Sequence, residues 1–260
     1  MREQAEKNKK AWEYRAYEYW NDQGSPADKA IYLKNDPLAR LRYHQKYFQN
    51  IKGIKIANPC GSNGRIAVPL ALLGAEVTIF DISEENKRYA LELAECAGVN
   101  IQYVVDDFYD VDMNIYSNCF DVVYSEGGIL HYFSEIDKFT ENLFKITKYN
   151  GKLILSDFHP FRKTDPESNA YQTGGDYFDS KIHKGDVAYK SFFPKEDADG
   201  FPDCSLRFYT LSEIINSVIK AGFVIKEFNE HPNWNNSKLP GEFTIIADKI
   251  QQLFRENMDY

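Results

Sequence analysis

The sequence predicts an α/β fold with a mostly parallel sheet flanked by helices. Short apolar runs alternate with helical patterns from residue 54 onward, and loops containing glycine or proline separate them. Hydrophobic residues make up 43% of the 260 residues, which is enough for one packed core. We expect a single domain with an N-terminal helical lid (1–50), a core (51–157), a cap insertion (158–207) and the C-terminal part of the sheet (208–260).

The first 50 residues are charged and aromatic, with Trp12, Tyr19 and Trp20 close together. The pattern predicts two or three helices ahead of the core. We place a break at Gly24-Ser25-Pro26, because glycine and proline disfavour a helix that continues through them.

The core alternates strands and helices. The predicted strands cover residues 54–57, 76–80, 101–105, 120–124 and 152–156. The predicted helices cover residues 64–73, 84–97 and 135–147. The helix over 84–97 has the clearest signals, because Ser83 can cap its first amides and Gly98 can end it in a left-handed conformation.

The alternation stops after Ser156 and resumes near the C-terminus. A helix over 211–221 and apolar runs at 223–228 and 243–247 complete a seven-stranded sheet. The intervening insertion is rich in aromatic residues, Tyr171 and Tyr189 among them, and contains Gly174-Gly175. These aromatics either close over a pocket or form a satellite core that never touches a substrate.

Charge and composition exclude several classes of function. A net charge of −8 and a pI near 5.3 oppose binding to nucleic acid, which favours a basic face. No apolar run is long enough to cross a membrane, and the polar start lacks a secretory signal, so we expect a cytoplasmic protein. The four cysteines show no metal-binding spacing, so we expect no metal.

The loop after the first strand indicates a ligand site. Its small residues, from Asn58 to Gly64, would let backbone amides approach a ligand. Asp81 ends the second strand 17 residues beyond Gly64, where an acid can accept hydrogen bonds from both ribose hydroxyls. The alternative is that Asp81 only begins the cap region of the next helix.

Two segments, IKIANPCGSNGRIAVPLALLGAEVTIFDIS and FDVVYSEGGILHYF, resemble motifs of the class I S-adenosylmethionine-dependent methyltransferases. The resemblance covers residues 52–157 and is looser beyond. It implies a Rossmann-like fold, S-adenosyl-L-methionine as the cofactor, a loop that embraces its methionine part, ribose held by Asp81, and an adenine amino group bound by Asp107. The implied cofactor-binding residues are Asn58, Cys60, Gly61, Gly64, Asp81, Ile82, Asp107, Phe108 and Ser125.

The chain departs from the family pattern at the first strand. Asn58 replaces the usual acid, and only Gly64 of the three loop glycines is kept. An amide can still accept a hydrogen bond from the cofactor's ammonium, but it adds no charge attraction. A nicotinamide-dependent enzyme is the alternative, because it also begins with this βαβ unit and binds ribose through an acid after the second strand. The matches at Asp107 and in the second segment argue against that enzyme.

Three catalytic candidates follow the fourth and fifth strands, where ligands collect in open α/β sheets: Glu126, His131 and His159. We slightly favour His159 as the residue that faces the substrate, because it opens the variable insertion. His131 is at least as consistent with a structural or cofactor-positioning role as with proton transfer.

The predicted activity is methyl transfer to an oxygen, nitrogen or carbon atom of a small molecule by a monomer or homodimer. A methyltransferase for RNA or protein is the second hypothesis, and a catalytically silent cofactor-binding homologue is the third. A hydroxyl acceptor must lose a proton, whereas a neutral amine can attack without a base. The type of acceptor therefore decides whether a histidine takes part.

Overall fold

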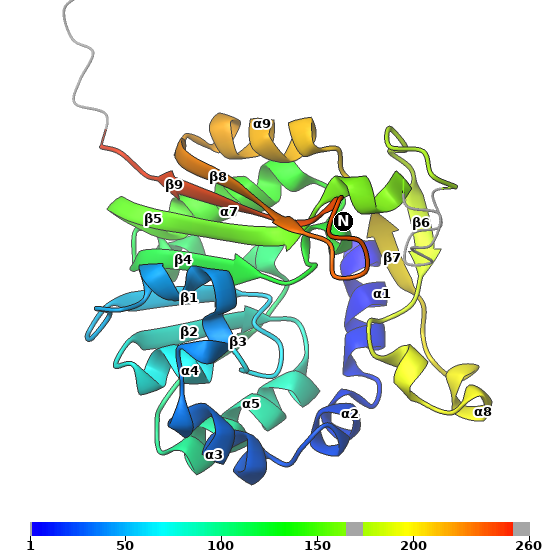
Figure 1. Cartoon of the computed structure of the whole chain (residues 1–260), viewed down its shortest axis with the longest axis horizontal. Helices are drawn as coiled ribbons and strands as arrows, with labels where there is room; N and C mark the ends of the chain where they lie inside the picture. The colour runs from blue at the N-terminus through cyan, green and yellow to red at the C-terminus, as the bar shows by residue number, and fades with distance from the viewer. Residues whose placement is uncertain (1, 165–173, 252–260) are drawn as a thin grey trace, which may run out of the picture.

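The computed structural model arranges seven strands in one sheet, in the order β3-β2-β1-β4-β5-β9-β8 (Figure 1). It describes residues 2–164 and 174–251; part of the predicted cap insertion, with Tyr171, lies outside these ranges. The strands of this sheet are β1 (Lys55–Pro59), β2 (Glu76–Asp81), β3 (Gln102–Val105), β4 (Phe120–Glu126), β5 (Thr147–Phe158), β8 (Val224–Pro232) and β9 (Pro240–Asp248). All seven predicted strands are therefore confirmed.

Strands β1 to β5 pair in parallel, β9 is antiparallel to β5, and β8 is antiparallel to β9. This is the mostly parallel sheet that the sequence predicts. Parallel strands bring their carboxyl ends to one edge, so the segments that follow β1, β2, β3 and β4 meet there.

Helices cover both faces of the sheet. The α-helices are α1 (Arg2–Glu13), α2 (Ala16–Asp22), α3 (Pro26–Asn35), α4 (Ala67–Leu72), α5 (Glu84–Ala97), α6 (Met113–Tyr116), α7 (Ile136–Ile146), α8 (Lys195–Ala198) and α9 (Leu211–Ala221). The 3₁₀ helices are η1 (Ala39–Tyr47), η2 (Phe108–Asp110), η3 (Leu130–Tyr132), η4 (Pro160–Thr164) and η5 (Lys190–Phe192). Side chains of α7 and α9 pack on one face, and side chains of η1 and α4 pack on the other. Among the described helices, none combines the length and apolar composition of a membrane span.

Local signals fixed the ends of α5. Oγ of Ser83 accepts a hydrogen bond from the Asn86 amide at 3.1 Å, and Gly98 ends the helix with φ 75°. Both predicted caps are confirmed. Helix α4 begins three residues later than predicted, at Ala67, because Gly64 has φ 76°, a left-handed conformation that a right-handed helix excludes.

A second, two-stranded sheet lies inside the predicted insertion. It pairs β6 (Ile182–Gly185) with β7 (Cys204–Arg207) in antiparallel fashion. Figure 1 shows α1 beside β7, at the carboxyl ends of the parallel strands. Residues of α1, α2 and the insertion form one satellite cluster, in which Tyr189 and Phe201 are buried and against which Trp12 packs. Many of the described insertion aromatics thus form a core of their own.

Candidate functional site

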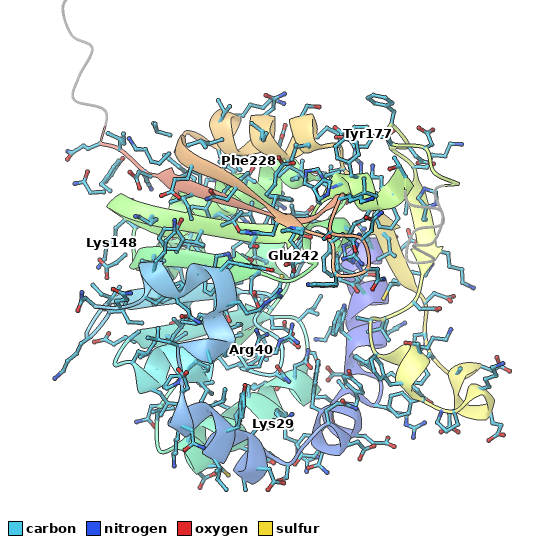
Figure 2. The ribbon with its side chains drawn as sticks, viewed as in Figure 1. Lys29, Arg40, Lys148, Tyr177, Phe228 and Glu242 are labelled. Atoms are coloured by element: carbon cyan, nitrogen blue, oxygen red, sulfur yellow. The ribbon has the colours of Figure 1, made fainter. Side chains whose placement is uncertain are left out.

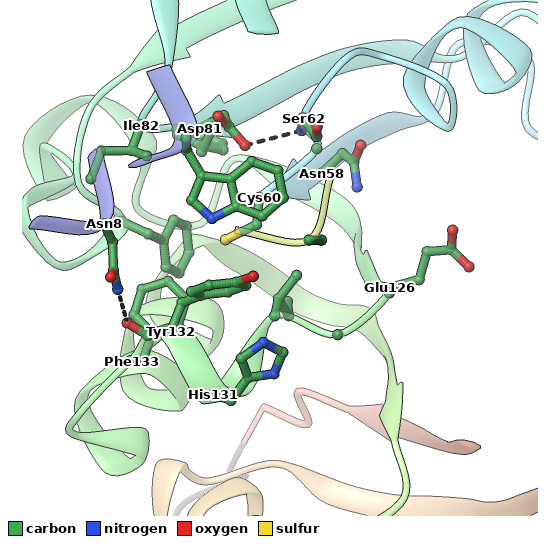
Figure 3. Close-up of a pocket in the computed structure, with 18 of the residues that line it drawn as sticks. Asn8, Asn58, Cys60, Ser62, Asp81, Ile82, Glu126, His131, Tyr132 and Phe133 are labelled. Carbon is green, nitrogen blue, oxygen red and sulfur yellow. Dashed lines mark hydrogen bonds between the residues drawn. The ribbon is translucent and has the colours of Figure 1, made fainter. Parts of the chain in front are cut away.

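A cavity of about 320 Å³ lies where the carboxyl ends of β1, β2, β3 and β4 meet the satellite cluster. Figure 3 shows its walls, with Asn58, Cys60 and Asp81 on the sheet side and His131 and Tyr132 opposite. Nine of the twelve sequence-predicted site residues line it: Asn58, Cys60, Gly61, Asp81, Ile82, Asp107, Phe108, Glu126 and His131. The topology of the sheet therefore gathers most of the candidates.

The loop after β1 carries side chains where backbone geometry favours glycine. Cys60 has φ 55° and Ser62 has φ 47°, both left-handed. An L-residue in this conformation costs roughly 1–2 kcal/mol relative to the right-handed one. Gly61 keeps the loop close to the strand, because a Cβ there would collide with Oδ1 of Asn58.

Asn58 presents an unpaired polar atom beside the cavity. Its Nδ2 donates to the carbonyl oxygen of Tyr124 at 2.9 Å, which fixes the amide plane. Its Oδ1 is buried and has no hydrogen-bond partner among the described residues, and Oγ of Ser62 is in the same situation. A buried acceptor without a donor is costly, so the site fits a ligand that brings one.

Asp81 is held by backbone amides. Oδ2 accepts from the Ser62 amide at 3.0 Å, drawn as a dashed line in Figure 3, and Oδ1 accepts from the Ser83 amide at 3.1 Å. Burial raises the pKa of Asp81. Nδ2 of Asn86 also donates to Oδ1 at 3.3 Å, so about one of the carboxylate's roughly four acceptor sites is left for a ligand. The neighbouring Ile82 lines the same wall.

Asp107 and Phe108 border the cavity where β3 ends. Oδ1 of Asp107 accepts from the Tyr109 amide at 3.0 Å and caps η2. Burial raises the pKa of the Asp107 carboxyl. Phe108 is buried in the main core as well, so its ring connects the cavity wall to the packing beneath it.

The loop after β4 is anchored by a buried carboxylate. Oδ2 of Asp157 accepts from the amides of Ile129 and Leu130 at 2.9 and 2.8 Å. Burial raises the pKa of Asp157 to about 6 despite these bonds. Asp157 therefore positions the segment that carries His131.

His131 is an uncharged histidine among aromatic rings. Burial, and then the charge of Arg162, lower its pKa to about 3. Its ring centroid lies 4.3 Å from that of Tyr132 and 6.5 Å from that of Phe158, with which it stacks. A neutral imidazole keeps one nitrogen free to accept a hydrogen bond.

Glu126 lines the cavity but is paired with a cation. Its Oε1 lies 3.3 Å from Nη2 of Arg40, and Figure 3 shows the carboxylate directed away from His131. This ion pair orients both side chains.

Three predicted residues do not line this cavity. Gly64 packs against α5, and a Cβ on it would stand 2.9 Å from Cβ of Ala90. Ser125 is buried in β4 and donates to the carbonyl of Pro59 at 3.1 Å. Both residues therefore support the loop from behind.

His159 differs most from the expectation that it faces the substrate. It is fully buried and borders a separate cavity of about 30 Å³. Its Nδ1 accepts from the Phe161 amide at 3.2 Å, and its Nε2 lies 3.0 Å from a carboxylate oxygen of Glu230. The chain turns immediately after β5, and this turn draws the ring away from the large cavity.

Sequence reasoning predicted an N-terminal helical lid with Trp12 and Trp20 but did not single out Asn8, which lines the same cavity. Asn8 in α1 donates to the carbonyls of Tyr132 and Ser205 at 3.0 and 3.1 Å and accepts from the Ser205 amide at 2.7 Å. Nε1 of Trp20 donates to Oδ1 of Asn86 at 2.8 Å. The tryptophans of the N-terminal segment were the available signal, whereas Asn8 had none.

Comparison with known proteins adds a family model described as a methyltransferase domain, which matches residues 59–155. Two curated relatives are ubiquinone biosynthesis O-methyltransferases. The one from Rickettsia conorii is 29% identical over 157 residues, which cover 58% of this chain and 53% of the relative. The one from Rickettsia canadensis is 26% identical over 213 residues, which cover 79% and 84%. The match thus spans about half the length of the first relative.

A solved structure from Listeria monocytogenes, described as an S-adenosylmethionine-dependent methyltransferase, shares the fold. Its TM-score with this chain is 0.62 at 19% sequence identity, over 82% of this chain and 98% of that one.

Proposed function

The chain is a class I S-adenosylmethionine-dependent methyltransferase, and from this premise we propose that it methylates an oxygen atom of a small molecule. The names of the two Rickettsia relatives support an oxygen acceptor. The observation that carries the proposal is the partly open, mainly apolar cavity, in which most of the candidate cofactor residues and His131 share one space of about 320 Å³.

The residues around the cavity fit S-adenosyl-L-methionine. The unpaired Oδ1 of Asn58 would accept from the cofactor's ammonium, and the held carboxylate of Asp81 would accept from a ribose hydroxyl. Asp107, at the end of β3, would accept from the adenine amino group. When bound, the cofactor supplies an electrophilic methyl group on a sulfonium.

At the other end of the cavity, His131 would hold the acceptor's hydroxyl. The acceptor's oxygen would take the methyl group that the bound cofactor supplies, and His131 would orient the acceptor's hydroxyl for this by accepting its hydrogen bond. A base with a pKa of about 3 orients a hydroxyl by accepting its hydrogen bond, but it does not keep the proton near neutral pH. We therefore assign His131 to orientation.

The satellite cluster would exclude water during transfer. Trp12, Trp20 and Tyr189 come from α1, α2 and the insertion, and all three line the cavity. Removing water strengthens the electrostatic interactions inside the cavity and keeps the two reactants in line.

The test uses S-adenosylmethionine with a ¹³C-labelled methyl group and three fractions of a cell extract: small molecules, RNA and protein. We expect the label in the small-molecule fraction, with a ¹³C shift typical of a methoxy carbon. Label in RNA or protein, or a shift typical of an N-methyl carbon, would contradict the proposal. Without product in any fraction, binding of S-adenosylhomocysteine by calorimetry would identify a silent homologue.

A further inference from the structure

Arg65 is an exposed cation of the cavity wall that forms no ion pair with the residues the structure describes. It follows the glycine loop directly and lines the cavity. Its Nη2 lies 3.6 Å from the position that a Cβ on Gly127 would take, so the guanidinium lies beside the end of β4. Within residues 2–164 and 174–251 the guanidinium makes no hydrogen bond or ion pair; only the backbone amide is engaged, with Oδ1 of Asn63.

The nearby carboxylates are already paired. Arg40 lies 3.3 Å from Glu126, and Arg42 lies 3.6 Å from Glu242. Figure 2 labels Arg40 and Glu242, one residue from each of these two pairs. Arg65 therefore gives this end of the cavity an excess of positive charge, although the whole chain has a net charge of −8. Desolvation by the surrounding protein and the charge of Arg40 lower the pKa of Arg65, and the charge of Glu126 opposes this shift.

The surplus is separated from the acids of the cavity. Asp81 and Asp107 lie at the ends of β2 and β3, whereas Arg65 lies beside the end of β4. S-adenosylmethionine brings one carboxylate, one ammonium and one sulfonium, so the cofactor as a whole adds positive charge to the cavity. An anion brought by the second substrate would offset this charge and that of Arg65.

The geometry points to a methyl acceptor that carries an oxyanion, a carboxylate or a phosphate, bound by Arg65 while its hydroxyl meets the methyl group. A planar guanidinium recognises such groups through two parallel hydrogen bonds. This inference rests on the proposed function and names the class of substrate. Arg65 then determines specificity, because a neutral analogue of the acceptor would leave the guanidinium unpaired.

The experiment separates the small-molecule extract on an anion-exchange resin at neutral pH and supplies ¹³C-methyl cofactor to each fraction. The wild-type protein is compared with Arg65→Gln, Arg65→Lys and the control Arg88→Gln, which changes an arginine on α5 outside the cavity wall. We expect labelled product only from the retained fraction. Arg65→Gln should lower kcat/KM by about ten- to a hundredfold, Arg65→Lys less, and Arg88→Gln not at all. Phosphatase treatment of the fraction abolishes the product if the oxyanion is a phosphate and spares it if it is a carboxylate.

Two results would overturn the inference. One is a labelled product from the unretained fraction. The other is an affinity for S-adenosylhomocysteine that falls about tenfold or more in Arg65→Gln, because Arg65 would then hold the cofactor's own carboxylate. The proposed function can fail independently of this inference. An N-methyl product from the retained fraction would contradict the oxygen acceptor but support the anionic acceptor. An O-methyl product from the unretained fraction would support the oxygen acceptor but contradict the anionic one.

Discussion

Nδ1 of His44 lies 2.8 Å from the phenolic oxygen of Tyr124, and Nε2 of the same ring lies 2.9 Å from Oγ1 of Thr244. These contacts join η1 to β4 and β9 beneath the site. His44 is only 3% exposed, and burial, followed by the charge of His231, lowers its pKa to about 4. The folded protein therefore contains an uncharged histidine whose two nitrogens are both engaged.

This network predicts a pH-dependent stability. The pKa of His44 is lower in the folded state than its ordinary value of 6.5, so the stabilisation is present above that pH and is lost as the pH falls toward about 4. The loss from one such group is about 1.4 kcal/mol per pH unit. We measure the free energy of unfolding with urea at pH 7, 6 and 5. This free energy should fall less steeply with decreasing pH in His44→Gln than in the wild type. Plots of unfolding free energy against pH that run parallel for the two proteins would contradict this account. Asp157 and the other histidines are present in both proteins, so their contributions cancel in the comparison.

Asp81→Asn tests the cofactor site. We expect the affinities for S-adenosylmethionine and S-adenosylhomocysteine to fall together by about ten- to a hundredfold, because a charged hydrogen-bond acceptor is lost. Calorimetry measures both constants. Asn can still accept from the Ser62 or Ser83 amide, so the loop should stay folded, and an unchanged melting temperature controls for this. Unchanged affinity, or preferential binding of a nicotinamide cofactor, would refute the assignment.

The sheet and α5 could be predicted because their signals are local. An apolar run shows a buried strand, and Ser83 and Gly98 mark the ends of a helix within a few residues of the chain. Sheet-edge topology then indicated that Asn58 and Asp81 would meet, since both follow parallel strands.

The rest depends on contacts that no local pattern encodes. Asn8 bonds to Ser205, almost two hundred residues away in sequence, and β6 and β7 are four-residue strands. His159 follows β5 as predicted, yet its direction is set by the Phe161 amide after the strand. The surplus charge of Arg65 appears only once the ion pairs of its neighbours are known.

Ser62→Gly tests the strain in the cofactor loop. Ser62 has φ 47°, and its buried hydroxyl has no partner among the described residues. Glycine adopts this conformation freely, so the substitution should raise the free energy of unfolding by about 1 kcal/mol, after the entropy that glycine loses on folding. Ser62→Val should lower it by about 2 kcal/mol or more, because a β-branched residue tolerates a positive φ least. Urea unfolding that ranks the two variants in the opposite order would exclude strain at this position.

Replacing His131 should affect turnover, whereas replacing His159 should affect stability. His131→Ala should lower kcat by about ten- to a hundredfold, because a hydrogen bond that orients the acceptor is lost, with cofactor affinity nearly unchanged. Since the pKa of His131 is about 3, its protonation should leave kcat flat between pH 6 and 8. A kcat that follows a group titrating near neutrality, and loses this dependence in His131→Ala, would show that His131 is a general base.

His159→Ala should act on stability instead. The ring stacks on Phe161 at 5.2 Å and its Nδ1 accepts that residue's amide, so removal leaves a small cavity and an unpaired donor. We expect a lower free energy of unfolding, by about 2 kcal/mol, with kcat/KM unchanged below the new melting temperature. A large loss of turnover without a loss of stability would return His159 to the active site.

Asn8→Ala tests whether α1 must stay docked for transfer to occur. Asn8 is 4% exposed, and its three hydrogen bonds tie α1 to Ser205 of β7 and to Tyr132 of η3, so their loss should loosen the helix that carries Trp12 over the cavity. Water would then enter while the sheet-side residues still hold the cofactor. We expect kcat to fall about tenfold or more, with the affinity for S-adenosylhomocysteine changed less than threefold.

Fluorescence supplies the structural readout for this variant. The chain has three tryptophans, and Trp234 is 58% exposed, so a Trp234→Phe background leaves Trp12 and Trp20 as the reporters. Acrylamide should quench these two weakly in the background protein, and more strongly once Asn8→Ala is added, because quenching follows access of solvent to the ring. Saturating S-adenosylhomocysteine should reduce quenching in both proteins if the satellite cluster closes over the ligand. Equal quenching with and without Asn8→Ala, together with full turnover, would contradict this prediction. It would mean that α1 stays docked over the cavity without the hydrogen bonds of Asn8.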